Sequence, residues 1–122
     1  MIGYATFGTN DLPRACAFYD ALCAELGAKR VLEFERGVAW GTSMAEPSLC
    51  VLTPFDGSNA SVGNGVMVAL VVKDRAQVAQ THAKALSLGA QDEGLPGDRG
   101  GGFYCAYFRD LDGNKLNVFC MG

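Results

Sequence analysis

The chain has 122 residues, 49% of them hydrophobic, and a formal net charge of −3 at pH 7. This length supports one domain, or two small halves that share a core. Nucleic-acid binding needs a cationic surface, and the chain has no basic run, so we exclude that class. No apolar run is long enough to cross a bilayer, and the amino terminus lacks a basic-then-apolar signal pattern. We therefore expect a cytoplasmic protein without membrane contact.

A strand followed by a helix is expected at the start of the chain. Residues 1–8 are short, apolar and interrupted by glycine, which is typical of a strand. Asn10 or Asp11 offers a helix N-cap, and Pro13 fits the first turn, where its missing N–H costs nothing. Apolar residues then recur at helical spacing until Gly27, which ends the helix.

Three short strand-like runs complete the first half, at residues 29–35, 38–42 and 48–53. Trp40 lies in the middle run, and two roles stay open for it: packing in the core, or a stacking wall for a ligand. Residues 54–64 contain Pro, Asp, Ser, Asn and Gly without periodicity, which is typical of a linker.

The second half follows the same order. Residues 66–72 form an apolar strand, Asp74 caps a second helix, and short strands follow from Gln91 onward. Residues 104–119 form a closing hairpin. Its turn is indicated by Asp112-Gly113, because Gly takes positive φ at no steric cost and Asp tolerates it.

An internal repeat relates the two halves. Asp74 follows Asp11 by 63 residues, and Leu88-Gly89-Ala90 follows Leu26-Gly27-Ala28 by 62. This predicts an α+β fold of two β-α-β-β-β repeats, at residues 1–53 and 65–122. The repeats form a curved, half-barrel-like mixed sheet around a cleft, and the whole chain counts as a single domain.

The five cysteines and the single histidine are expected to be structural. No cysteine pair has CxxC spacing, which favours reduced, mostly buried thiols over a zinc site or a disulfide framework. His82 lies on the second predicted helix, and we expect a partly buried structural residue there.

Four motifs occur in matching order with a known family. They are the segment from Asp11 to Phe18-Tyr19, the Gly63-Asn64-Gly65 triplet, Pro96-Gly97-Asp98-Arg99, and the run from Phe108 to Asn114. In the last motif Leu111 replaces the family's usual Pro. Over nearly its whole length the chain resembles the vicinal oxygen chelate superfamily, which includes glyoxalase I, bleomycin-resistance proteins, fosfomycin-resistance enzymes and extradiol dioxygenases.

The resemblance implies a divalent metal, held by His, Gln or Glu from the first and last strands of each half. Aligned on the strand starts, these positions fall on Tyr4, Met67 and Asn117, with the fourth at Ser48 or Cys50. A neutral phenol, a soft thioether and an uncharged amide are poor ligands for zinc, magnesium or manganese. We therefore expect no metal there, and no other cofactor.

The resemblance also turns the helices outward and the other sheet face toward the cleft. Strand alternation then places these residues under the helices: Ala5, Phe7, Val66, Val68, Leu70, Leu116 and Val118. It points these into the cleft: Tyr4, Thr6, Met67, Ala69, Asn117 and Phe119. Arg99 precedes a run of three glycines, and is either a clamp for a carboxylate or phosphate, or a solvated loop charge.

Three functions follow from this picture. The favoured one is a glyoxalase-like homodimer that binds a small organic molecule without metal, by analogy with bleomycin-resistance proteins. Its ligand contacts would come from Tyr4, Thr6, Trp40, Met67, Arg99, Asn117 and Phe119. The alternatives are a lyase, isomerase or dioxygenase, with atypical metal ligands or with Tyr4 as acid or base, and a purely structural domain. Whether the protein is an enzyme stays open.

Overall fold

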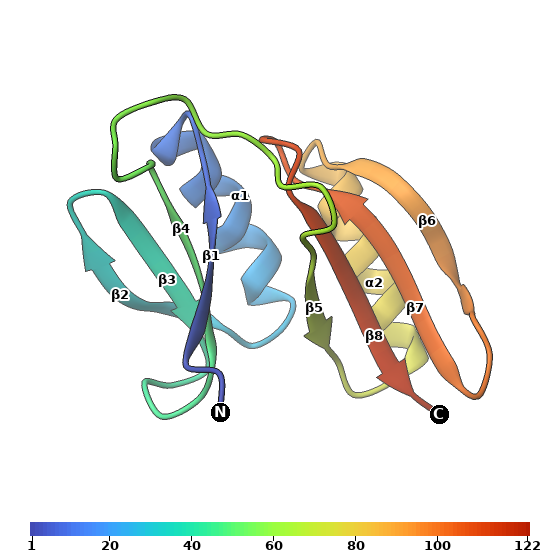
Figure 1. Ribbon diagram of the computed structural model, residues 1–122. Coiled ribbons are helices and arrows are strands. Elements are labelled where there is room, and N and C mark those ends of the chain that lie inside the picture. Colours follow the sequence, from blue (N-terminus) through green and yellow to red (C-terminus); the bar gives the residue numbers. More distant parts are fainter. The chain divides into compact units, whose positions relative to one another are not determined.

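A computed structural model describes all 122 residues, which divide into two compact units, Met1–Val62 and Gly63–Gly122. Each unit contains one helix and one four-stranded mixed sheet, with the helix against one face of its sheet (Figure 1). No helix is long and apolar enough to span a membrane.

The first unit contains β1 (Tyr4–Gly8), α1 (Leu12–Ala24), β2 (Lys29–Phe34), β3 (Gly37–Gly41) and β4 (Ser48–Leu52). Its strand order is β1-β4-β3-β2. The first and last strands of the unit, β1 and β4, are neighbours and run parallel, whereas the remaining pairs are antiparallel.

The second unit has the same topology. It contains β5 (Val68–Val71), α2 (Arg75–Ser87), β6 (Gln91–Asp98), β7 (Phe103–Arg109) and β8 (Lys115–Met121), in the order β5-β8-β7-β6. Two β-α-β-β-β modules are therefore confirmed. Their strands form two separate sheets and not a closed barrel.

The helix starts follow the capping signals in the sequence. Asp11, one of the two predicted N-caps, accepts a hydrogen bond from the backbone N–H of Arg14. Asp74 does the same for Gln77 at the start of α2. Each cap satisfies a backbone donor that has no partner within the helix, which is why these boundaries can be predicted locally.

The starts of β1 and β5 differ from the prediction. β1 begins at Tyr4 and not at residue 1, and β5 is limited to Val68–Val71. The backbone N–H of Val66 bonds to the carbonyl of Gly63, which closes a turn immediately before β5. Alternation had predicted that Val66 lies under α2. Its side chain is instead 51% exposed, because the residue belongs to this turn and not to the strand.

The closing hairpin is correctly placed, but its turn has another origin. No residue other than glycine has positive φ, so Asp112 does not adopt the conformation that a two-residue hairpin turn requires. Instead, Asp110 Oδ1 accepts hydrogen bonds from the backbone N–H groups of Asp112 and Asn114. Within this loop, Gly113 is the one residue with positive φ, at 90°. The buried carboxylate of Asp110 therefore organises the loop.

The core of the second unit forms between α2 and the inner face of its sheet. Val78, Ala85, Phe108, Leu116 and Val118 are all fully buried. His82, also buried, packs edge-on against the ring of Phe108, and its Nε2 lies 3.0 Å from Asp92 Oδ1. The histidine thus has a packing role and a polar partner within its own unit.

All five cysteines are free and buried, as expected for thiols that act as small apolar side chains. Desolvation by burial raises the pKa of the Cys23 thiol to about 12. Such a thiol is protonated at neutral pH and is a poor nucleophile.

Thr81 on α2 offers a test of the core. It is fully buried and its hydroxyl has no hydrogen-bond partner. We expect Thr81→Val to raise the free energy of unfolding by about 1 kcal/mol, because an isosteric methyl replaces a desolvated hydroxyl. Thr81→Ser keeps the hydroxyl and removes the methyl, so it should be destabilising. Urea titrations of both variants would measure this, and a less stable valine variant would contradict it.

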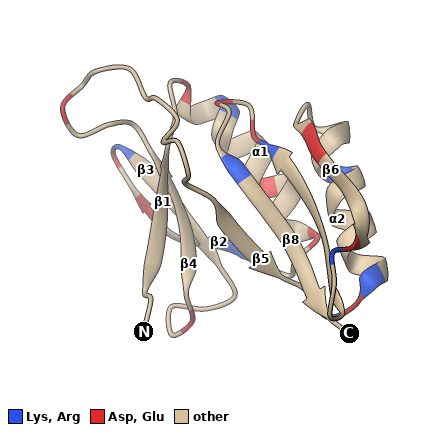
Figure 2. Cartoon of the chain, turned by 45° about the vertical axis from the view of Figure 1, so that its right-hand side comes forward, with Lys and Arg blue, Asp and Glu red and all other residues tan.

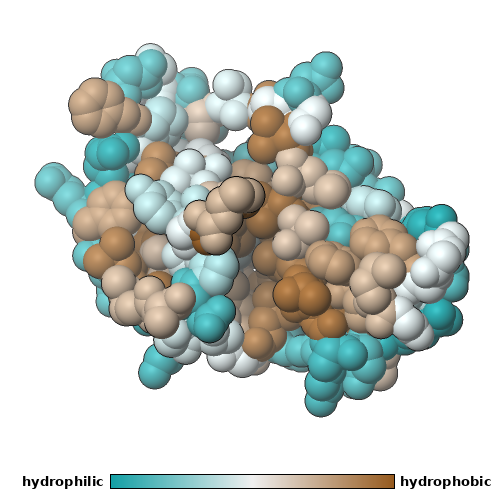
Figure 3. Space-filling model, turned by 60° about the horizontal axis from the view of Figure 1, so that its bottom comes forward, coloured by the Kyte–Doolittle hydropathy of each residue, from teal (hydrophilic) through white to brown (hydrophobic).

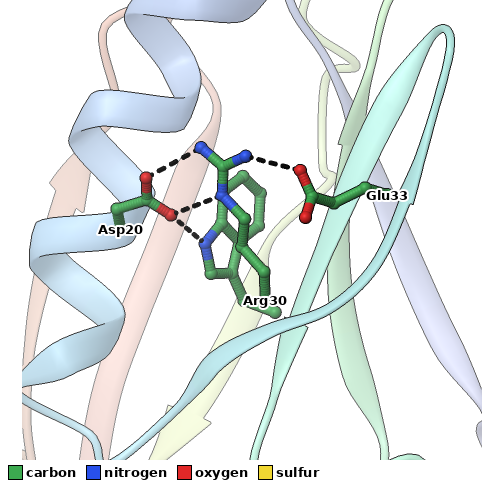
Figure 4. Close-up of polar contacts among 4 residues, drawn as sticks. Asp20, Arg30 and Glu33 are labelled. Carbon is green, nitrogen blue, oxygen red and sulfur yellow. Dashed lines mark hydrogen bonds and ion pairs between the residues drawn. The ribbon is translucent and has the colours of Figure 1, made fainter.

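A polar cluster joins α1 to the first sheet (Figure 4). Asp20 on α1 accepts two hydrogen bonds from Arg30 on β2, at 2.9 and 2.8 Å, and a third from Trp40 Nε1 on β3, at 2.8 Å. Arg30 also donates to Glu33 at 2.8 Å. The cluster lies on the sheet face that α1 covers.

The Asp20 cluster should make stability depend on pH. Hydrogen bonds from Arg30 are the main cause that holds the pKa of the Asp20 carboxyl below its ordinary value. The stabilisation is therefore complete above the unfolded-state pKa of about 3.9 and is lost as pH falls through the lower folded-state pKa. We expect Asp20→Asn to cost about 1 kcal/mol at pH 7, a modest value because the carboxylate is partly exposed. The difference from wild type should shrink in urea titrations as pH falls through the folded-state pKa of Asp20, and a constant difference would contradict this.

Candidate ligand pocket on the first sheet

A pocket on the first sheet follows from the sequence of its middle strand. In β3, Gly-Val-Ala-Trp-Gly, the large side chains of Val38 and Trp40 alternate with small residues. Because side chains alternate between faces, Val38 and Trp40 pack beneath α1, and Gly37, Ala39 and Gly41 lie on the face away from it. The neighbouring strands approach Gly37 and Gly41 closely, and Ala39 between them lines a pocket on this face.

The neighbouring strands provide the walls. Register pairs Ala39 with Cys50 on β4 and with Leu32 on β2, and Cys50 pairs with Thr6 on β1. The resulting pocket has a volume of about 590 Å³, which is in the range of small-molecule sites. It is lined by Gly3, Tyr4, Thr6, Val31, Leu32, Phe34, Arg36, Ala39, Ser43, Met44, Glu46, Ser48, Cys50 and Leu52.

The pocket is mostly apolar, with a few polar groups. Strands β1, β3 and β4 contain no charged residue, and Figure 2 shows β1 and β4 without charge. Tyr4, Thr6 and Ser48 are the hydroxyl-bearing residues of the lining, and Arg36 and Glu46 are its charged residues. Such a composition suits an organic ligand that a few polar groups orient.

Two of the seven predicted contact residues, Tyr4 and Thr6, line this pocket. Trp40 does not. It is 2% exposed, its ring centroid lies 5.4 Å from that of Tyr19 on α1, and its indole N–H bonds to Asp20. Of the two roles predicted for Trp40, the structure shows packing in the core and not a stacking wall for a ligand.

The other four predicted contact residues belong to the second unit. Asn117 and Phe119 on β8 alternate with Leu116 and Val118, which are fully buried, so they lie on the face away from α2. Asn117 is itself 1% exposed. Its Nδ2 donates to the Ala106 carbonyl, and its buried Oδ1 has no partner.

Phe119 and Met67 differ in their surroundings. The Phe119 ring packs against the ring of Phe103, with centroids 5.2 Å apart. Met67 precedes β5 and is 42% exposed. Contact of either residue with a ligand stays a prediction.

Arg99 lies differently from the predicted loop clamp. Its guanidinium folds back over the Tyr107 ring, 5.6 Å from the centroid, and donates to the carbonyls of Cys105 and Leu95. Glycine at position 97 makes this possible, because a Cβ there would lie 2.8 Å from Arg99 Nη1. Backbone carbonyls of its own sheet thus hold the side chain. Ligand binding by Arg99 stays a prediction.

Strand register resolves the fourth position implied by the resemblance. In the first unit, the backbone N–H of Thr9 donates to the carbonyl of Leu52 on β4, and in the second unit that of Val72 donates to the carbonyl of Phe119 on β8. Thr9 and Val72 are equivalent in the repeat, so Leu52 and Phe119 are equivalent as well. Two residues earlier on the same strands, Cys50 is therefore equivalent to Asn117. Of the two candidates, Cys50 is the counterpart.

The residues at the four positions do not fit a divalent metal. They are a phenol, a thiol, a thioether and an amide, from Tyr4, Cys50, Met67 and Asn117. Burial raises the pKa of the Cys50 thiol, against a smaller opposing effect of Arg36, so it does not supply a thiolate at neutral pH. Nowhere in the chain do three or more His, Cys, Asp or Glu side chains gather as a potential metal site.

Several pocket residues were missed by the sequence reasoning. Leu32, Phe34 and Met44 form apolar walls, and Arg36 lies between the predicted strand runs 29–35 and 38–42. The available signal was the alternation of small and large residues along β3, which separates a face of small side chains from a face of large ones.

Two β-α-β-β-β modules, with a ligand-sized pocket on a sheet face, define a protein of the glyoxalase-like class. The Glyoxalase/Bleomycin resistance protein/Dioxygenase superfamily model matches residues 1–118, and the chain belongs to this superfamily. No match was found among curated proteins.

Solved structures agree with this assignment. A glyoxalase/bleomycin resistance protein from Albidiferax ferrireducens is 29% identical, with a TM-score of 0.92 over 100% of this chain and 99% of that one. A hypothetical protein from S. aureus is 24% identical, with a TM-score of 0.76 over 98% and 92%. A lactoylglutathione lyase from Agrobacterium tumefaciens is 22% identical, with a TM-score of 0.70 over 98% and 92%. The last two similarities establish the fold alone.

Proposed function

We propose that this protein binds a small organic molecule in the pocket of the first sheet, without the divalent metal of its superfamily. The pocket itself supports the proposal: about 590 Å³ of mostly apolar walls, with hydroxyls from Tyr4, Thr6 and Ser48. The hydroxyls orient the ligand by hydrogen bonds, and the apolar walls provide the affinity through burial.

A thermal-shift screen tests binding. A ligand that binds only the folded state raises the melting temperature by mass action, so members of a panel of small aromatic and aliphatic compounds should raise it in proportion to their affinity. Thr6→Val keeps the shape of the wall and removes its hydroxyl, and should weaken the ligands that use it. A broad panel without any shift would favour the structural-domain alternative.

Metal analysis separates the binding protein from a metal-dependent lyase, isomerase or dioxygenase. Protein purified without chelator should contain metal far below one equivalent, because the four superfamily positions provide no charged ligand. Near-stoichiometric zinc, manganese or iron, lost in Asn117→Ala or Tyr4→Phe, would contradict the proposal and support the enzyme.

The proposal extends to a cytoplasmic homodimer. Large apolar side chains outside the pocket are exposed in both units, among them Ile2 and Val62 in the first and Val71 and Met121 in the second. Figure 3 shows broad hydrophobic areas on the face it presents. Exposed apolar areas are typical of protein interfaces. Light scattering that gives the monomer mass would exclude the dimer.

A further inference from the structure

The two charged residues of the pocket lining lie at opposite ends of its middle strand. Arg36 directly precedes β3 (Gly37–Gly41), and Glu46 lies in the connection that follows it. A strand rises about 3.3 Å per residue, so five residues separate the ends by about 16 Å. The two charges therefore do not form an ion pair, and each end of the pocket has its own polarity.

Arg36 is held in place but is not neutralised. Its Nη1 donates to the Thr53 carbonyl at 2.6 Å, and its guanidinium lies 5.3 Å from the centroid of the Phe55 ring. No carboxylate lies within ion-pair distance of it. In contrast, Arg30, Arg75 and Arg109 each pair with an acid, at 2.8, 3.2 and 2.7 Å.

Arg36 is half-buried, and apolar residues such as Phe34 and Leu52 line the pocket with it. Arginine has five N–H donors, and one of them is used by Thr53. Its charge reaches the pocket floor, because Arg36 lowers the pKa of Cys50 against the larger opposite effect of burial. A fixed cation with free donors, next to an apolar pocket, is complementary to an anion with an apolar body.

We infer that the ligand of this pocket is an organic monocarboxylic acid, whose carboxylate binds Arg36 and whose apolar body lies over Ala39 and Cys50. The inference rests on the proposed binding function and adds the class of ligand. A carboxylate matches the planar fork of a guanidinium, which can donate two parallel hydrogen bonds to it. One cation balances one negative charge, whereas a phosphate dianion would lack a second cation among the residues that line the pocket.

The test uses matched compounds that differ only in the head group. Three series, with phenylhexyl, naphthylbutyl and octyl bodies, each contain the carboxylate, the primary amide and the amine, and calorimetry measures their binding to the full-length chain. We expect the carboxylates to bind at least tenfold more tightly than the amides, and the amines to bind most weakly. Arg36→Gln should remove the preference, and Arg36→Lys should keep part of it.

The control is Lys29→Gln, which removes one positive charge at an exposed position of β2 outside the pocket and should leave the preference unchanged. Melting curves of the free variants show whether each still folds. Equal binding of acids and amides, or an unchanged preference in Arg36→Gln, would overturn the carboxylate inference and leave the binding function in place. Absence of binding by every compound would overturn both.

Discussion

Replacing Trp40 by alanine is expected to destabilise the first unit by about 3–5 kcal/mol, the usual cost of removing a large aromatic side chain from a core. Trp40 is 2% exposed and packs against Tyr19 beneath α1, so few neighbours can move to fill the space. Typical domains are stable by about 5–15 kcal/mol, and the loss would thus be a large part of the total. Urea unfolding should be followed by circular dichroism, because the chain contains a single tryptophan.

Trp40→Phe is the matched control. It keeps most of the apolar area and removes the hydrogen bond from the indole N–H to Asp20, so it should cost about 1–2 kcal/mol. It should bind pocket ligands as the wild type does, because the ring lies on the sheet face away from the pocket. If Trp40→Phe is fully stable but loses ligand binding, the placement of Trp40 in the core is wrong.

The sequence predicted the features that local chemistry determines. Asp11 and Asp74 start the helices, and the glycines after them end the helices, because caps depend on residues within one turn. The repeated β-α-β-β-β order could be predicted from the sequence, because the same cap and glycine signals recur in both halves. The turn at Asp110 was not, because it depends on the side chain of a residue that precedes the predicted Asp112-Gly113 pair.

The site depends on relations between distant segments, and these were harder to predict. The choice of Cys50 over Ser48 requires the parallel register of β1 and β4, strands that are separated along the chain by α1, β2 and β3. Alternation in β3 divides large from small residues, but the packing of Tyr19 on α1 decides which face is the core. Arg36 follows no strand period because it lies in a turn, so its place in the pocket lining was not predictable.

Filling the pocket from its floor is expected to abolish ligand binding while the fold is retained. Ala39 is the suitable position, because Gly37 and Gly41, on the same face of β3, have no room for a larger side chain. A Cβ on Gly37 would lie 2.6 Å from the Val51 carbonyl oxygen, and one on Gly41 would lie 3.2 Å from the Ser48 Cβ. The leucine of Ala39→Leu instead extends into the pocket of about 590 Å³. Its cost in stability should therefore be smaller than the loss of about 1–3 kcal/mol that is typical of overpacking a filled core.

The expected loss of affinity for pocket ligands is at least tenfold, because leucine occupies the space over the pocket floor that the apolar body of the ligand would fill. Ala17→Leu is the matched control: it introduces the same side chain at an exposed position of α1 and should change neither binding nor melting temperature appreciably. Calorimetry and melting curves of the two variants, measured side by side, separate occlusion from unfolding. Unchanged affinity in a folded Ala39→Leu variant would show that ligands bind elsewhere, and the second sheet face around Asn117, with its unpartnered buried carbonyl, would then be the next surface to test.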